Sequence, residues 1–397
     1  MPKSDLETLF SPCIIGARNA PNRLVAQPVE SNDGTDRGEP TERTIQHYAN
    51  LARGGWGTVV VESTSVNNRS LGRLNGLVLT DKTASAYEAM VSAFKDACPD
   101  ALFIIQITHS GRQSHPTTDL VTITPNSPGH ERYLSADEIQ EIVDESVVSG
   151  LLAEKLGFDG IDYKMCNAYL GTETMRPTNT RSDRWGGAFE NRMRFMTEGV
   201  SRILAARQSE DFLVGARISF CEGSVGGFGA AGPDTDRFDP SEPLESIRVM
   251  DRLGMDFCSI TGLPVDLSGY DLTPAEVREP SLFYERLTKQ LIADERLSLP
   301  VLGAGYSELG KDTWTIAAQR VRDGHADCVG FARQTLADPY TPNKLCSGET
   351  ISYCTRCNIC QQLVLNQFQG GCVVYDDYFA AQLPALRKLQ AGAGHSH

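Results

Sequence analysis

The chain has 397 residues, of which 40% are hydrophobic and 22% are charged, with a formal net charge of −14. This ordinary globular composition excludes collagen, coiled-coil and intrinsically disordered chains. No run approaches the ~18 consecutive apolar residues of a membrane helix, the first residues do not resemble a secretory signal, and an acidic chain with scattered basic residues argues against nucleic-acid binding. We therefore expect a cytoplasmic protein that contacts neither membranes nor nucleic acids.

Short apolar runs rich in Val, Ile and Phe recur along the chain and alternate with helical patterns. Near-continuous hydrophobicity is typical of parallel strands that are covered on both faces. One helix between them is marked by a capping box at Ser135 and Glu138 and by a terminal Gly157. The predicted strands cover residues 23–29, 58–63, 102–108, 160–165, 213–219, 257–262, 300–305 and 328–333.

Eight strands with helices between them predict an α/β fold, the (β/α)8 TIM barrel. A doubly wound sheet is the alternative, but residues 30–34 after the first strand read Glu-Ser-Asn-Asp-Gly and not as a glycine-rich dinucleotide turn. We expect residues 1–345 to form the barrel domain and residues 346–397 to form a short, cysteine-rich C-terminal extension.

Reactive residues of such a barrel gather at the carboxyl ends of its strands. The last two strands end in small residues, Ala304-Gly305 and Ala332, and Arg333 follows the second of them. Small residues leave backbone N–H groups free and the arginine adds a positive charge, a combination typical of a phosphate site. The alternative interpretation of these small residues is that the glycine only permits a turn of the backbone and binds no phosphate.

Four of the 11 cysteines crowd together near the C-terminus, with the spacing Cys354-x2-Cys357-x2-Cys360-x11-Cys372. Three thiolates this close in sequence can face one centre, and the fourth returns from a short loop, which suits a 4Fe–4S cluster. A zinc site and four unrelated thiols remain as alternatives.

The most specific stretch is residues 157–170, which include the fourth predicted strand with Lys164 and, after it, Asn167 and Tyr169. A run of Arg, Asp, Gly-Gly and Glu-Asn-Arg follows this stretch. Other landmarks occur in order along the chain: Asn22-Arg23 with Pro28, Arg53-Gly54-Gly55, Gln106 with His109 and Gly111-Arg112, and Arg333 with Asp338-Pro339. In these motifs, residues 5–345 resemble the old yellow enzyme family of FMN-dependent oxidoreductases.

The resemblance implies a bound FMN. It places Gln106 on the pyrimidine edge of the flavin and Arg217 near N1 and the C2 carbonyl, where a fixed cation stabilises the reduced anion. Ala332 replaces the usual glycine, and its methyl group is tolerable if its φ angle is negative. The expected phosphate site comprises Ala304, Gly305, Ala332 and Arg333. The remaining cofactor-binding residues are expected to be Pro28, Val29, Glu30 and Ser63.

Two of the expected site residues depart from the family pattern. Lys164 stands where the family usually has a histidine that donates, with Asn167, to a substrate oxygen. Lys164 could also donate, pair with a substrate carboxylate, or form a salt bridge away from the site. Glu30 replaces a Thr or Cys beside flavin C4=O and N5, where an ionised carboxylate would lower the reduction potential. We expect burial to raise the pKa of Glu30 and soften that effect.

Tyr169 matches the family's tyrosine that protonates the substrate carbon, so Lys164, Asn167 and Tyr169 are the expected catalytic residues. The resemblance then implies hydride transfer between FMN and an activated C=C bond of a small enone or enoyl substrate, with NAD(P)H or a partner protein as electron donor.

The cysteine pattern is similar to that of the family's iron–sulfur branch, which includes trimethylamine dehydrogenase and bacterial 2,4-dienoyl-CoA reductase. Oxidation of an amine or acyl-thioester, with electrons leaving through the cluster, is therefore an alternative. An electron-transfer subunit of a larger complex is another. We also expect a homo-oligomer.

Overall fold

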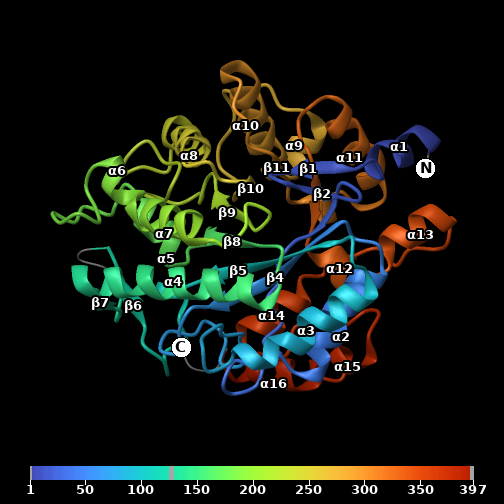
Figure 1. The fold of residues 1–397 in the computed structure, drawn as a ribbon, viewed down its shortest axis with the longest axis horizontal. Coiled ribbons are helices and arrows are strands. Elements are labelled where there is room, and N and C mark those ends of the chain that lie inside the picture. The colour runs from blue at the N-terminus through green and yellow to red at the C-terminus, as the bar shows by residue number, and fades with distance from the viewer. Residues whose placement is uncertain (1, 125–128, 394–397) are drawn as a thin grey trace.

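The structure is a computed structural model in which residues 2–124 and 129–393 are described. Eight parallel strands form one sheet in the order β11-β10-β9-β8-β5-β4-β3-β12. A bridge between Leu302 and Cys328 joins the two ends of this sheet. The sheet therefore closes into a barrel with helices around it (Figure 1). The predicted TIM barrel is confirmed.

All eight predicted strands are present. Four of them are shorter than predicted. The backbone beyond two of these still bonds to the neighbouring strand: Gln27 N donates to Phe331 O at 2.8 Å and Gly303 N to Cys328 O at 2.9 Å. The barrel strands are β3 (Leu24–Ala26), β4 (Thr58–Ser65), β5 (Leu102–Thr108), β8 (Gly160–Met165), β9 (Leu213–Ser219), β10 (Phe257–Thr261), β11 (Val301–Leu302) and β12 (Val329–Phe331).

The helices pack outside the barrel. The longest one begins at the predicted capping box, where Ser135 Oγ accepts from Glu138 N, and ends at Gly157 in the left-handed conformation with φ 91°. The main outer helices are α2 (Glu42–Arg53), α3 (Ala84–Ala97), α4 (Ala136–Leu156), α7 (Arg194–Ala206), α8 (Ser241–Arg252), α10 (Ser281–Glu295) and α11 (Thr313–Arg322). Shorter elements are α1 (Lys3–Leu9), β1 (Cys13–Ile15), β2 (Arg18–Ala20), η1 (Gly111–Gln113), β6 (Val121–Thr122), β7 (Arg132–Tyr133), α5 (Leu170–Met175), α6 (Phe189–Arg192), α9 (Pro274–Arg278), η2 (Tyr306–Asp312) and α12 (Arg333–Ala337).

The inside of the barrel changes character along the strands. An apolar cluster that includes Val25, Ile104 and Leu302 fills one part of it. Further along β5 and β9, the buried side chains become polar, at Gln106 and Arg217. Since these residues lie toward the carboxyl ends of their strands, the fold places its buried polar groups at the mouth of the barrel.

The C-terminal extension folds back against this mouth. Gly370 N donates to Ser31 O at 2.7 Å, and the Arg43 guanidinium of α2 lies 3.4 Å from the centre of the Tyr378 ring. In Figure 1, α15 (Asp377–Ala380) accordingly lies beside α2. The other helices of the extension are α14 (Ile359–Leu365) and α16 (Leu383–Ala393), and α13 (Thr341–Ser347) leads from the barrel into the extension.

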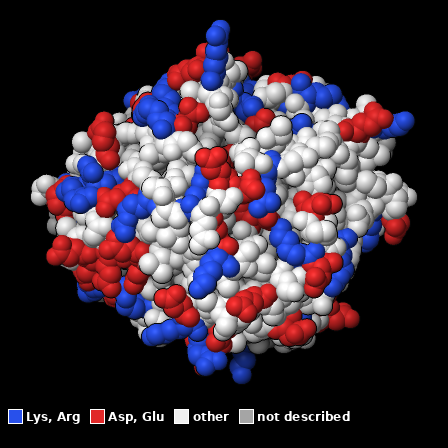
Figure 2. All heavy atoms as spheres, in the orientation of Figure 1, with Lys and Arg blue, Asp and Glu red and all other residues white. Residues whose placement is uncertain are grey.

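Acidic and basic side chains are interspersed on the face shown in Figure 2. Independently of this view, charged side chains of the described residues form ion pairs, such as Arg132 with Asp119 at 2.7 Å and with Glu138 at 2.6 Å. Within the described ranges, no helix combines the length and the hydrophobicity that crossing a bilayer requires.

Candidate functional site

A cavity of about 990 Å³ opens at the carboxyl ends of the barrel strands. Its size is in the range of pockets for organic ligands and cofactors. Residues from β3, β4, β5, β8, β9 and β12, or just beyond them, meet there with residues of the extension. The predicted cofactor-binding and catalytic residues that line it are Pro28, Val29, Glu30, Ser63, Gln106, Lys164, Asn167, Tyr169, Arg217, Ala332 and Arg333. Of the four predicted cluster ligands, Cys360 also lines it.

Two residues of the predicted phosphate site, Ala304 and Gly305, are not among the described residues that line this cavity. Gly305 has a φ of 90°, and a Cβ there would lie 2.4 Å from the Glu279 side chain, so only glycine fits. Ala332 has a φ of −100°, which lets it carry its methyl group without left-handed strain. Of the four residues of the predicted phosphate site, Ala332 and Arg333 therefore line the cavity. We call the part of the cavity that they line its phosphate end.

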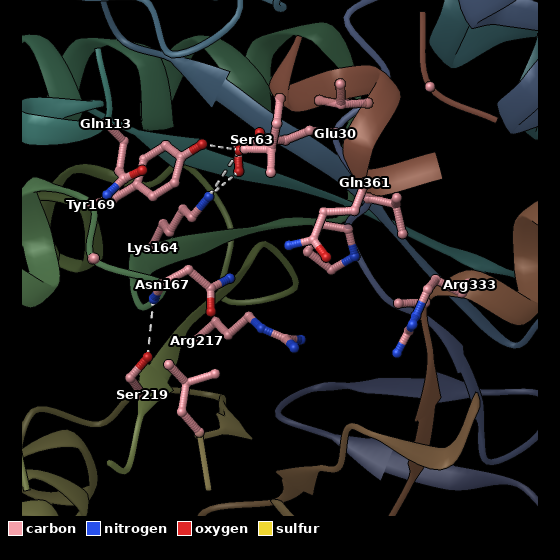
Figure 3. A pocket seen from close by; sticks show the side chains of 18 of the residues that line it. Glu30, Ser63, Gln113, Lys164, Asn167, Tyr169, Arg217, Ser219, Arg333 and Gln361 are labelled. Carbon is pink, nitrogen blue, oxygen red and sulfur yellow. Dashed lines mark hydrogen bonds and ion pairs between the residues drawn. The ribbon is translucent and has the colours of Figure 1, made fainter. Parts of the chain in front are cut away.

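Glu30 and Lys164 form an ion pair inside the cavity, with 3.3 Å between Lys164 Nζ and Glu30 Oε1 (Figure 3). Lys164 Nζ also donates to Ser63 Oγ and lies 3.3 Å from the centre of the Tyr169 ring. Tyr169 Oη donates to Glu30 Oε1, while Arg73 Nε lies 2.9 Å from Glu30 Oε2. The Lys164 side chain is 3% exposed, so its salt bridge lies within the site.

The expected rise in the pKa of Glu30 is wrong in sign. Burial does raise this pKa, but the positive charges of Lys164 and Arg73, with hydrogen bonds from Tyr169 and Lys164, outweigh burial and lower it to about 2. Glu30 is therefore ionised at neutral pH, and the neighbouring cations balance its charge. Burial and the Glu30 charge raise the pKa of Tyr169 well above its usual value, which keeps its phenol protonated.

Asn167 lies in a strained turn just after β8. Its φ is 60° and that of Ala168 is 59°, a conformation that residues other than glycine adopt rarely and mostly at functional sites. The Asn167 backbone N–H donates to Ser219 Oγ at 3.0 Å, which anchors the turn to the end of β9. The turn presents the Asn167 side chain to the same cavity as Lys164 (Figure 3).

Gln106 and Arg217 are buried polar residues in the wall of the cavity, with exposures of 1% and 8%. Gln106 Oε1 accepts from Ser63 Oγ at 2.9 Å, and its Nε2 donates to Asp162 Oδ2 at 2.7 Å. Arg217 Nη1 donates to Gln27 Oε1. These contacts fix the orientation of the Gln106 amide and of the Arg217 guanidinium.

The motif that follows the fourth barrel strand mainly holds its own loop together. Arg181 pairs with Asp183 and donates to Leu134 O at 2.8 Å. Of the motif residues, Arg176 reaches the cavity, where it binds Glu222 through two hydrogen bonds of 2.7 Å. The run of Arg, Asp and Gly-Gly that follows Tyr169 is therefore largely a scaffold for the site.

Several lining residues were missed by the sequence analysis. Arg73 lies on the loop after β4, and no local pattern marks it. Glu222 follows the end of β9 closely, so the strand-end rule could have found it. The residues from the extension could be found only with knowledge of how the segment that carries the clustered cysteines (residues 354–372, the cysteine segment) packs against the barrel. The missed residues include Arg73, Glu222, Glu308, Arg356, Asn358 and Gln361.

The four clustered cysteines lie in the extension, and two of them, Cys354 and Cys360, lie close to Arg333. Burial raises the pKa of Cys354 and of Cys360, while the charge of Arg333 acts on both to lower it. Cys357 and Cys372 lie close enough to Cys354 to raise its pKa as well. Four thiols are the type of ligand that a 4Fe–4S cluster requires. Within the described ranges, however, no group of three or more Cys, His, Asp or Glu side chains is arranged to hold a metal ion.

Comparison with known proteins identifies the family. The model of the NADH:flavin oxidoreductase / NADH oxidase family matches residues 8–350. The chain belongs to this family. The predicted family is thus confirmed.

Individual relatives agree with this assignment. The NADH oxidase of Thermoanaerobacter brockii is 30% identical over 88% of this chain and 53% of its own length. The N,N-dimethylglycine/sarcosine dehydrogenase of Chromohalobacter salexigens is 28% identical over 92% of this chain and 52% of its own length. The chain thus spans about half the length of these curated relatives. A 2-naphthoyl-CoA reductase structure shares the fold, with a TM-score of 0.78, 24% identity, and coverage of 93% of this chain and 57% of that one.

Proposed function

We propose that the chain binds FMN in the cavity at the barrel mouth and transfers a hydride between the flavin and an activated C=C bond of a small enone or enoyl substrate. NAD(P)H or a partner protein would donate the electrons. One observation carries this proposal: Gln106 and Arg217, suited to a flavin, share a single cavity with Lys164, Asn167 and Tyr169, suited to a substrate.

The residues present suit the cofactor. Ser63 and Asp162 each occupy one side of the Gln106 amide, which leaves a second lone pair and a second N–H for the edge of a flavin ring. Arg217 is a buried cation that favours negative charge on a bound ring. Ala332 and Arg333 would hold the phosphate. FMN would supply the hydride chemistry, and the protein the orientation and electrostatics.

The other side of the cavity suits a substrate with a polarised oxygen. Lys164 and Asn167 would donate hydrogen bonds to that oxygen, the lysine as a charge-assisted donor. Tyr169 would give its proton to the substrate carbon. Its raised pKa keeps that proton available at neutral pH, and the ring contact with Lys164 holds the phenol beside the donor pair.

The second candidate is oxidation of an amine or acyl-thioester. The relative named N,N-dimethylglycine/sarcosine dehydrogenase favours it, as does the position of the thiols beside Arg333. In this proposal electrons leave through a 4Fe–4S cluster held by the four cysteines, Cys354, Cys357, Cys360 and Cys372. An electron-transfer subunit is the remaining alternative. We also propose a cytoplasmic homo-oligomer.

Anaerobically purified protein tests these proposals. We expect the flavin absorption spectrum, FMN at one per chain, and iron and acid-labile sulfide in equal amounts. Enone turnover with NAD(P)H supports reduction, whereas amine turnover with an artificial electron acceptor supports the second candidate. Bound flavin without either turnover supports the electron-transfer role. Protein that binds no flavin refutes the proposal, and zinc or free thiols refute the cluster.

A further inference from the structure

The phosphate end of the cavity is poor in net positive charge. The guanidinium of Arg333 forms an ion pair with Glu308. A second carboxyl group, Glu279, is close enough to Arg333 to feel its charge, and it would contact a Cβ at Gly305. The expected phosphate arginine is therefore already matched by acidic groups. A phosphate dianion needs additional positive charge to bind there.

Arg356 lies at this end of the cavity. Its Nη1 donates to the backbone oxygen of Glu308 at 3.2 Å, and the residue lines the same cavity as Arg333. Arg333 Nη1 donates in turn to Asn358 Oδ1 at 2.9 Å. The contacts of Arg356 with Glu308 and of Asn358 with Arg333 thus join the cysteine segment to the phosphate end of the cavity. Both arginines, Arg333 and Arg356, contact Glu308.

The backbone at Arg356 is also unusual. Its φ is 59°, in the left-handed region that favours glycine. Asn358, with a φ of 63°, belongs to a residue type that is enriched in this region, whereas arginine adopts it less often. A strained cation on a cavity wall calls for a compensating interaction, and such strain clusters at ligand-binding positions.

We propose that Arg356 is a second guanidinium for the phosphate group of the flavin, brought to the cavity by the cysteine segment. The inference rests on the proposed binding of FMN and extends it. Arg333 and Glu308 together carry no net charge, so Arg356 restores the positive balance that the phosphate requires, with a planar donor fork suited to phosphate oxygens. Because Arg356 lies between Cys354 and Cys357, the order of that segment also determines flavin retention.

FMN and riboflavin provide the test because they differ only in the phosphate group. Arg356→Gly removes the charge and retains access to the observed φ, so the segment keeps its course. In flavin-free protein, we expect the Kd for FMN, measured by quenching of flavin fluorescence, to rise about tenfold or more. The Kd for riboflavin should not change. Thr355→Ala, at a neighbouring exposed position, is the matched control and should change neither value.

Arg356→Lys separates charge from shape. It should recover part of the FMN affinity, since it restores the charge without the planar fork; a lysine variant no better than the glycine variant refutes the proposal. An unchanged Kd for FMN, or equal rises for FMN and riboflavin, also refutes it. A raised KM for NADPH with unchanged FMN affinity would instead assign Arg356 to a nucleotide phosphate. If wild-type protein binds neither flavin, the proposed function itself fails.

Discussion

Replacing Glu30 by glutamine tests the charge balance of the cavity. The substitution removes the carboxylate that Lys164 and Arg73 share, at 3.3 and 2.9 Å, and leaves an amide oxygen that can still accept from Tyr169. The pKa of Glu30 is lowered from 4.5 to about 2, and at 1.36 kcal/mol per pKa unit this corresponds to about 3 kcal/mol of native-state stabilisation. The side chain is 17% exposed, so solvent screens little of this energy.

We therefore expect Glu30→Gln to lower the free energy of unfolding by about 3 kcal/mol at pH 7, measured by urea denaturation. The folded-state pKa is depressed, so the Glu30 contribution is present above pH 4.5 and is lost as the pH falls toward 2. The difference in the free energy of unfolding between wild type and variant should become smaller as the pH falls over that range. Glu7→Gln, which removes an exposed partner of Lys3, is the control and should leave stability unchanged.

Two results would contradict this reasoning. One is a Glu30 variant within about 0.5 kcal/mol of wild type at pH 7, the range of ordinary surface substitutions. The other is a stability difference that stays constant from neutral pH to pH 3. Either would mean that the two cations do not stabilise the Glu30 carboxylate in the folded protein.

Three further substitutions address the proposed chemistry. Lys164→Met should lower kcat/KM for an enone by about 10²–10³-fold, the effect of losing one oxyanion donor; an unchanged value would remove Lys164 from catalysis. Arg217→Ala should slow flavin reduction, followed by stopped-flow absorbance, more than it weakens FMN retention, and normal reduction kinetics would place Arg217 away from N1. Cys360→Ser should lower the iron content and make the extension more sensitive to protease, because ligation orders such a segment; wild-type iron content would exclude Cys360 as a ligand.

The barrel could be predicted because its strands are mostly apolar and are buried on both faces. Every residue of β5, β8 and β9 is buried, and such runs are recognisable without knowledge of their neighbours. The strand-end rule then places Gln106, Lys164 and Arg217 at one mouth. These predictions depend only on local pattern and on the topology that the pattern implies.

The pairing of charges in the site could not be predicted. The pKa of Glu30 depends on Arg73, which a loop after β4 brings to the cavity, and on Lys164, 134 residues away in the chain. Burial was the only effect visible from the sequence, and alone it has the wrong sign. The path of the extension is likewise set by long-range contacts such as that of Gly370 with Ser31, which no local pattern encodes.

The ion pair suggests that the two departures from the family pattern depend on each other. A lone carboxylate at Glu30 would oppose negative charge on a bound flavin, and a lone ammonium at Lys164 would be buried without a partner, whereas together each offsets the other. Glu30→Thr and Lys164→His should each destabilise the protein, because the first removes the carboxylate that Lys164 and Arg73 share and the second leaves Glu30 paired with Arg73 alone. The test measures the free energy of unfolding in urea for both single variants and for the double variant. The decrease in the double variant should be smaller than the sum of the two single decreases, by about 1 kcal/mol or more. Additive losses would mean that the two positions are energetically independent.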